Sequence, residues 1–156
     1  MRGFTLVELS ITIAIIIILA VVSAPIYGSL QVRTQLGESS AQIVQALRGA
    51  RELSVAGYKS QAHGIYLNFN NLGADSYVAY QGLSYAARDT AYDQVFVLEK
   101  ALSFVNVDLN QDSGDIDINF SQGLGLPNSQ GSFKLAHGAQ GVKTISINKK
   151  GKVEEN

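Results

Sequence analysis

The chain lacks cysteine and tryptophan and has only two prolines and two histidines among its 156 residues. Without cysteine it can form neither a disulfide nor a thiolate metal site, so core packing alone must stabilise its folded part. The formal net charge is −1, which provides no overall attraction to nucleic acid. No nucleotide-binding loop, nucleophile elbow or carboxylate pair on a defined scaffold occurs. We therefore predict that the protein is not an enzyme and that it binds no cofactor and no metal.

Charged residues are especially scarce near the N terminus. Glu8 is the one charged side chain in residues 4–25, where isoleucine, leucine and valine predominate. A helix of about 20 apolar residues spans the hydrocarbon core of a bilayer, so this run predicts a transmembrane helix. Arg2 precedes the run, and Arg33 is the next basic residue after it. By the positive-inside rule, we expect a single-pass membrane protein with a cytoplasmic N terminus and an exported C-terminal part.

Residues 3–9 have a specific order. Their sequence, GFTLVEL, resembles the processing and assembly signal of type IV pilins and type II secretion pseudopilins. The resemblance implies that residues 1–3 are a leader, that a prepilin peptidase cleaves between Gly3 and Phe4, and that Phe4 is then N-methylated. It further implies that the subunit is first a single-pass protein of the inner membrane. From that lipid bilayer it would pass, through an inner-membrane assembly platform, into a periplasmic pseudopilus or a cell-surface pilus.

Two residues of the apolar run have a role implied by the same resemblance. Glu8 would pair with the N-terminal amine of a neighbouring subunit. An unpaired carboxylate at the bilayer centre costs at least about 2.5 to 3.5 kcal/mol, which a cationic amine would relieve. Pro25 would bend or melt the helix locally, because proline removes one intrahelical hydrogen bond. The alternative is an ordinary signal-anchored membrane protein, in which Glu8 lies near the interface and Pro25 only ends the span.

Beyond Pro25 the pattern is that of an amphipathic helix over residues 26–57, with Gly57 as its helix-ending glycine. Charged and amide side chains occupy the faces away from one apolar stripe. The apolar residues that recur at helical spacing are Leu36, Ile43, Val44, Leu47, Ala50 and Leu53.

After Gly57 the period of the apolar pattern becomes two, which predicts about seven short antiparallel strands in a globular head of residues 58–156. We therefore expect an α+β fold, with a long N-terminal amphipathic and transmembrane helix packed on an antiparallel β-rich C-terminal head. The expected strands contain residues 65–69, 77–80, 95–98, 104–107, 116–120, 133–135 and 142–147.

Three loose motifs in this part resemble the H-type minor pseudopilins and FimT-type minor pilins. They are LRGAR at residues 47–51, IDINF at residues 116–120 and ISINKKGKV at residues 145–153. The resemblance implies a minor structural subunit whose partners are other pilin or pseudopilin subunits. A major pilin, a DNA-binding minor pilin for DNA uptake and a solitary membrane-anchored domain are the alternatives.

Residues 108–115 have two interpretations. They place oxygen ligands at alternate positions, as at the start of a calcium loop. However, the glycine comes one place late and no closing glutamate follows. A polar turn between two strands is therefore the preferred interpretation, and calcium binding is the alternative.

The C-terminal region contains the one basic cluster of the chain, and two isolated histidines complete the set of candidate residues. Glu154 and Glu155 offset the basic cluster, so we expect lysines that protect a strand edge and do not expect DNA as a partner. For His63 and His137 we expect surface or capping roles, because neither has a cysteine or acidic residue nearby to complete a metal or catalytic site. The lysines of the cluster are Lys143, Lys149, Lys150 and Lys152.

Overall fold

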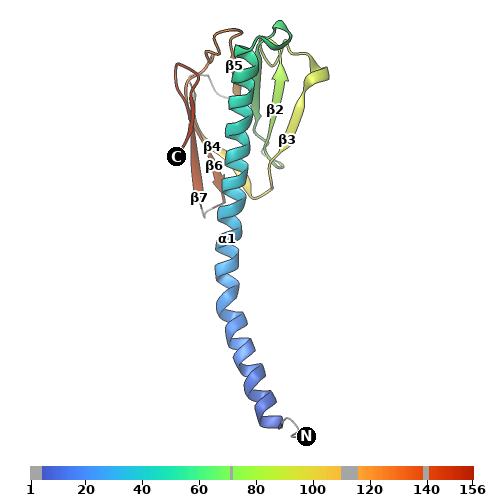
Figure 1. Ribbon diagram of the computed structural model, residues 1–156, viewed down its shortest axis with the longest axis vertical. Helices are drawn as coiled ribbons and strands as arrows, with labels where there is room; N and C mark the ends of the chain where they lie inside the picture. Colours follow the sequence, from blue (N-terminus) through green and yellow to red (C-terminus); the bar gives the residue numbers. More distant parts are fainter. Residues whose placement is uncertain (1–4, 71, 110–115, 139–140) are drawn as a thin grey trace. The chain divides into compact units, whose positions relative to one another are not determined.

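The structure, a computed structural model, describes residues 5–70, 72–109, 116–138 and 141–156, apart from the side chains of residues 22–26. It contains one long helix, α1 (Leu6–Val55), followed by a β-rich part (Figure 1). The chain divides into two compact units, Met1–Thr34 and Gln35–Asn156, and α1 contributes to both of them.

Within the described residues, no helix combines the length and the apolar character that crossing a membrane requires. The prediction of a transmembrane helix over residues 4–25 is therefore wrong, and so is the single-pass inner-membrane location inferred from it. The expected α+β fold is corrected to a β-rich antiparallel part that follows a helix without a membrane-spanning segment. The physical reason is that polar side chains recur up to Thr12, so the polar-free stretch among the described residues is 13–21. This stretch is about 13 Å long at 1.5 Å per residue, against a hydrocarbon core of about 30 Å.

The end of α1 follows the prediction. The helix ends at Val55, and Gly57 has a left-handed backbone with φ of 62°. The 3-10 helix η1 (Tyr58–Ser60) comes next, and its residues Lys59 and Ser60 have positive φ values of 52° and 55°. Such a backbone is uncommon for residues other than glycine, so the surrounding structure must maintain the position of Lys59.

The β-rich part consists of two antiparallel sheets. The first has the strand order β3-β2-β1-β5 and the second has the order β4-β6-β7-β8. A short 3-10 helix, η2 (Thr90–Tyr92), precedes β3. The strands are β1 (His63–Asn68), β2 (Ser76–Gln81), β3 (Gln94–Val97), β4 (Leu102–Leu109), β5 (Ile116–Phe120), β6 (Gly131–His137), β7 (Gly141–Ile147) and β8 (Val153–Glu155).

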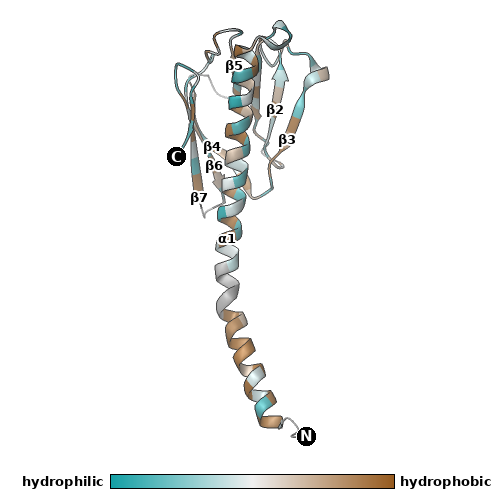
Figure 2. Ribbon diagram, in the orientation of Figure 1, coloured by the Kyte–Doolittle hydropathy of each residue, from teal (hydrophilic) through white to brown (hydrophobic). Residues whose placement is uncertain are grey.

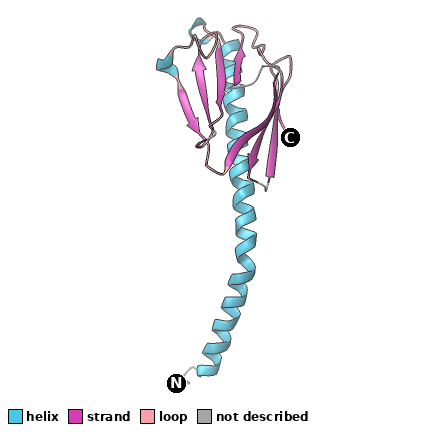
Figure 3. Cartoon of the chain, turned by 180° about the vertical axis from the view of Figure 1, so that it is seen from behind, coloured by secondary structure: helices cyan, strands magenta, loops and turns pink. Residues whose placement is uncertain are grey.

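One apolar core joins the last part of α1 to both sheets, which flank it in Figure 3. The helix contributes the predicted stripe, except that Leu53 is 42% exposed. The fully buried residues with large side chains come from the helix and from both sheets. They include Ile43, Leu47, Ile65, Leu67, Tyr77, Ile118, Phe120, Phe133, Leu135 and Ile145.

Sequence reasoning missed strand β8. Its three residues include Glu154 and Glu155, which are poor strand formers and show no alternation long enough to detect. The strand forms because Val153 is buried in the core and because β8 pairs with the end of β7. Packing thus overrides the weak local preference.

Candidate assembly surface

Glu8 lies in the first turn of α1, three residues after Thr5. The Thr5 N–H and the Thr5 hydroxyl each donate a hydrogen bond of 2.9 Å to Glu8 Oε2. The Glu8 N–H donates in return to Thr5 Oγ1 at 3.2 Å. This reciprocal arrangement is a capping box, which satisfies backbone N–H groups that have no partner at a helix start. Sequence reasoning missed this local role, although the spacing Thr-x-x-Glu signals it.

The capping box also sets the charge of Glu8. The hydrogen bond from the Thr5 backbone and then that from the Thr5 side chain lower the pKa of this exposed carboxyl below its usual value. Glu8 is therefore a carboxylate at neutral pH, at a helix end that favours negative charge. Among the described residues, both bonds from Thr5 reach Oε2, so Oε1 is available to a donor from another molecule.

The first part of α1 exposes apolar side chains on all of its faces, and we call residues 6–21 the apolar helix surface. Every described side chain from residue 5 to residue 21 is exposed, with Leu6 at 80% and Leu19 at 63%. Figure 2 shows hydrophobic colouring along most of this part of α1, interrupted near its start by hydrophilic colouring. Complete burial of one such side chain stabilises a protein by about 1.5 to 3 kcal/mol. The apolar helix surface is therefore the strongest candidate for contact with another molecule.

Several predicted sites lie outside the described residues. Gly3 and Phe4, the predicted cleavage and methylation site, are among them, and so is the side chain of Pro25. Cleavage, methylation and a bend at Pro25 stay predictions.

The proposed calcium loop lies largely outside the described part as well, because its residues 110–115 are not described. Asp108, which is described, belongs to β4 and pairs with Ser132 of β6. In the described part of the chain, no group of three or more His, Asp or Glu side chains is arranged to hold a metal ion. The calcium loop and the polar turn both stay predictions.

The C-terminal lysines are partly neutralised. Lys143 Nζ lies 3.1 Å from Glu155 Oε1, and Lys152 forms an ion pair with Glu154. The hydrogen bond from Lys152 and its charge lower the pKa of Glu154. The two glutamates thus offset two of the four lysines, as the sequence indicated.

The two histidines differ in exposure. His63 is only 6% exposed, so the expectation of a surface position is wrong for this residue, while His137 is half-buried at the end of β6. Burial lowers the pKa of His63; a hydrogen bond to the Gln61 backbone opposes this effect, and the charge of Lys59 adds to it. His63 is therefore neutral at pH 7, and its Nδ1 has no hydrogen-bond partner among the described residues.

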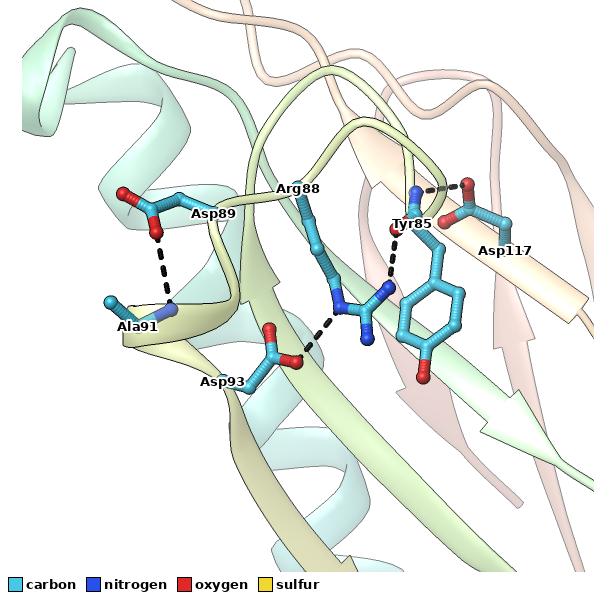
Figure 4. Close-up of polar contacts among 6 residues, drawn as sticks. All are labelled: Tyr85, Arg88, Asp89, Ala91, Asp93 and Asp117. Atoms are coloured by element: carbon cyan, nitrogen blue, oxygen red, sulfur yellow. Dashed lines mark hydrogen bonds and ion pairs between the residues drawn. The ribbon is translucent and has the colours of Figure 1, made fainter.

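A buried polar network fastens the loop of residues 82–93 to the first sheet. The Tyr80 hydroxyl donates to Asp117, and Asn119 Nδ2 donates to Tyr80 Oη and to Gly82 O, both at 2.9 Å. The Tyr85 N–H donates to Asp117 Oδ2 at 3.0 Å (Figure 4). Burial and the hydrogen bond to Asp117 raise the pKa of Tyr80 far above its usual value.

Arg88 connects two parts of the same loop by hydrogen bonds. The Arg88 Nε donates to Asp93 Oδ2 at 2.8 Å, and the Arg88 Nη1 donates to Tyr85 O at 2.7 Å (Figure 4). The guanidinium of Arg88 also lies 3.7 Å from the centroid of the Tyr85 ring. The Tyr85 ring stacks on that of Tyr66. Because these groups contact one another, the network indicates a structural role for the loop. Sequence reasoning missed it, since tyrosines mixed with charged residues do not show which of them will meet.

No family model, no curated protein and no solved structure matches this chain.

Proposed function

We propose that this protein is a structural subunit of a helical filament of the type IV pilus or type II secretion pseudopilus kind. The observation that carries the proposal is the apolar helix surface of residues 6–21. In a filament, many copies of one helix pack together, and each copy covers the apolar side chains of its neighbours. Such contacts join two different faces of the same subunit, so they repeat without closing and build a polymer.

The difference in exposure between the two units supports an intermolecular role for this surface. In the unit of residues 35–156, the apolar stripe of α1 is buried by the two sheets of the same chain, and Leu47 is fully buried. Leu19, in the other unit, is 63% exposed. A helix that is apolar on all of its faces needs neighbours on all of them. Copies of the same helix provide such an environment.

Glu8 would determine how neighbouring copies align. After cleavage between Gly3 and Phe4, the amine of Phe4 would be a cation at the end of a neighbouring helix. That amine would donate to Glu8 Oε1, while Thr5 continues to donate to Oε2. The capping box and the intermolecular pair are compatible because they use different oxygen atoms.

The first test is intact mass with N-terminal sequencing of the chain from producing cells. The native chain is compared with Gly3→Ala, with Glu8→Ala and with the native chain in a strain that lacks the prepilin peptidase. We expect the native chain to begin at N-methylated Phe4, and Gly3→Ala and the peptidase-deficient strain to leave the leader uncleaved. Glu8→Ala should be processed but lost from filaments. A native chain that retains residues 1–3 would contradict the proposal.

Ser10→Ala is the matched control for Glu8→Ala. Ser10 also lies in the exposed first part of α1, but its hydroxyl donates to Leu6 O within the same helix at 2.8 Å. We expect this variant to be processed and incorporated normally. Equal loss of incorporation in both variants would show that the helix as a whole, and not the carboxylate of Glu8, matters for assembly.

Within the filament, we propose a minor subunit with a structural and not an enzymatic role. Its partners would be other pilin or pseudopilin subunits, the prepilin peptidase and the assembly machinery. The alternative of a major pilin differs in copy number. Quantitative mass spectrometry of isolated filaments distinguishes the two, because an excess of this chain over every other subunit would contradict a minor role.

A further inference from the structure

The outer edges of the sheets differ in how they are protected from pairing with another chain. On β5, the segment after the strand occupies the free edge. Asn128 Oδ1 accepts from the Asn119 N–H at 2.8 Å, and Asn128 Nδ2 donates to Asp117 O at 3.0 Å. The Asn128 N–H donates to Asn119 O at 2.9 Å. The N–H and C=O of Asn119 and the C=O of Asp117 on this edge of β5 are therefore already paired.

The two outer strands of the second sheet are protected by other means. On β4, Asp75 Oδ2 accepts from the Phe104 N–H at 2.7 Å, and the strand register shifts between Val105 and Asp108. Strand β8 has only three residues, and its Glu154 is in an ion pair with Lys152. Short, charged or irregular edges are the usual ways in which proteins avoid pairing with other chains.

Strand β3 is also short, with four residues, but within the described part of the chain it has no ion pair, no register shift and no polar side chain bonded to its free edge. It pairs with β2 on one side, and all four of its residues are exposed, with Val95 at 62% and Val97 at 69%. Its sequence, QVFV, contains no charge and no proline, and its pairing with β2 is regular. Such an apolar edge is a template on which another strand can add.

A groove runs along the inner face of β3, between this strand and α1. Its larger part is a cavity of about 530 Å³ whose walls include Ala46 of α1 and Tyr92 before β3. A smaller hollow continues it along the same strand, and the two parts share Gln42, Tyr77 and Phe96. Alternate side chains of a strand added to β3 would point into this groove.

The groove has opposite charges at its two ends. Lys59 lines the cavity where β3 begins, and its Nζ lies 3.4 Å from the centroid of the Tyr92 ring. Within the described part of the chain, no carboxylate lines this cavity. Glu38 and Glu99 line the smaller hollow, where β3 ends. A strand antiparallel to β3 would begin beside the two glutamates and end beside Lys59.

We propose that β3 is a docking site for an extended segment of another protein, which adds to the first sheet as an antiparallel strand. The segment has a basic residue at its N-terminal end, opposite Glu38 and Glu99, and an acidic residue at its C-terminal end, opposite Lys59. Its backbone pairs with the free edge of β3, and its inward side chains occupy the groove. This interaction goes beyond the filament proposal and does not depend on it.

His63 lies beside the groove but is too far from the free edge of β3 to contact an added strand. It begins β1 and lies on the same face as Ile65 and Leu67, which is the inner face of the sheet. His63 also lines the cavity, and its Nδ1 is buried without a partner among the described residues. Because β2 and β3 lie between β1 and an added strand, at about 4.8 Å per strand, His63 sets no requirement on the partner.

The probe for this proposal is the labelled peptide KSYVAYQE. Its central six residues repeat β2 (Ser76–Gln81), which is the antiparallel partner of β3 in the sheet, and its ends carry the proposed charges. The full-length chain in detergent is titrated by fluorescence anisotropy, and hydrogen exchange locates the contact. We expect saturable binding and slowed exchange of the β3 amides. The charge-swapped peptide ESYVAYQK should bind at least about threefold more weakly, because two exposed ion pairs are reversed.

Variants of the protein sharpen the test. Val95→Lys should weaken binding of KSYVAYQE by about tenfold or more, because a charged side chain blocks an apolar edge. Val142→Lys is the matched control, since Val142 is a 54% exposed valine in β7, and its binding should equal that of the native chain. Lys59→Glu should abolish the preference between the two peptides, because each peptide then meets one end of opposite charge and one end of like charge. Circular dichroism of each variant establishes that it is folded.

Three results would overturn the proposal. The first is a lack of saturable binding of KSYVAYQE by the native, folded chain. The second is equal affinity of the native chain for KSYVAYQE and ESYVAYQK, or equal binding of KSYVAYQE by the native chain and by folded Val95→Lys. The third is protection of the β3 amides that depends on the concentration of the chain alone, which would show that a second copy occupies this edge.

Discussion

The two ends of α1 belong to one helix but differ in the exposure of their apolar side chains. In residues 6–21 the apolar side chains surround the helix and are exposed, whereas in residues 35–55 they form one stripe that the two sheets bury. The distribution of apolar residues around the helix, more than their number, accounts for the difference. A stripe can be covered by one neighbouring surface, and the chain has that surface in its own sheets. An all-round apolar helix needs other molecules.

The largest difference between the two parts of α1 is expected when the same substitution is made in each of them. Leu47→Ala removes a fully buried side chain and should lower the free energy of unfolding by about 2 to 5 kcal/mol. Leu19→Ala removes an exposed side chain and should change it by less than about 0.5 kcal/mol, while reducing filament assembly. Urea denaturation followed by circular dichroism measures both. Equal losses would show that residues 6–21 are part of the folding unit.

A second prediction concerns the internal bonds of the unit of residues 35–156. Tyr80→Phe removes the hydroxyl that bonds to Asp117 and Asn119. It should lower the free energy of unfolding, measured by urea denaturation, by about 1 to 2 kcal/mol. The pKa of Tyr80 is raised above its unfolded value of 10.0, so its contribution is present below pH 10 and declines as the pH rises above 10. In Tyr80→Phe the free energy of unfolding should therefore fall less steeply above pH 10 than in the native chain. An identical decline in both proteins would contradict the assignment.

A third prediction tests the independence of the helix start. Thr5→Ala removes the capping box of Glu8 and should destabilise the first turn by about 0.5 to 2 kcal/mol. Hydrogen exchange should accelerate in residues 6–10, while the urea midpoint of the β-rich part stays unchanged. Thr12→Ala is the control, because Thr12 bonds only to Leu9 O within the helix among the described residues. A shifted urea midpoint in Thr5→Ala would show that the two regions are coupled.

The smallest predicted effect concerns His63. Burial lowers its pKa below the unfolded value of 6.5, so its contribution to stability is present above pH 6.5 and is lost as the pH falls below it. The free energy of unfolding should therefore decline slightly more steeply below pH 6.5 in the native chain than in His63→Gln. Urea midpoints measured between pH 7.5 and 5 give this difference. The same dependence of the urea midpoint on pH in the native chain and in His63→Gln would show that His63 is exposed to solvent.

Local patterns predicted much of the fold. The stripe of Leu36, Ile43 and Leu47 repeats at helical spacing, and the alternation in Ile65 to Phe69 repeats at strand spacing, so each element follows from neighbours in the chain. The capping box was equally readable, because Thr5 and Glu8 are close in sequence. The length of the apolar run misled the prediction of a membrane span, since the polar residues up to Thr12 shorten the apolar stretch.

The helix stripe, the cap and most of the strands follow from the amino-acid sequence alone, because they depend on residues a few positions apart. Three features became visible only in the folded chain: β3 lies at an unprotected edge, Asn128 pairs with the edge of β5, and His63 is buried beside the groove. These features depend on contacts between residues distant in the chain, and the strand order that creates them is not encoded in any short stretch. The periodicity of one strand specifies which face is buried, but not which strand lies next to it.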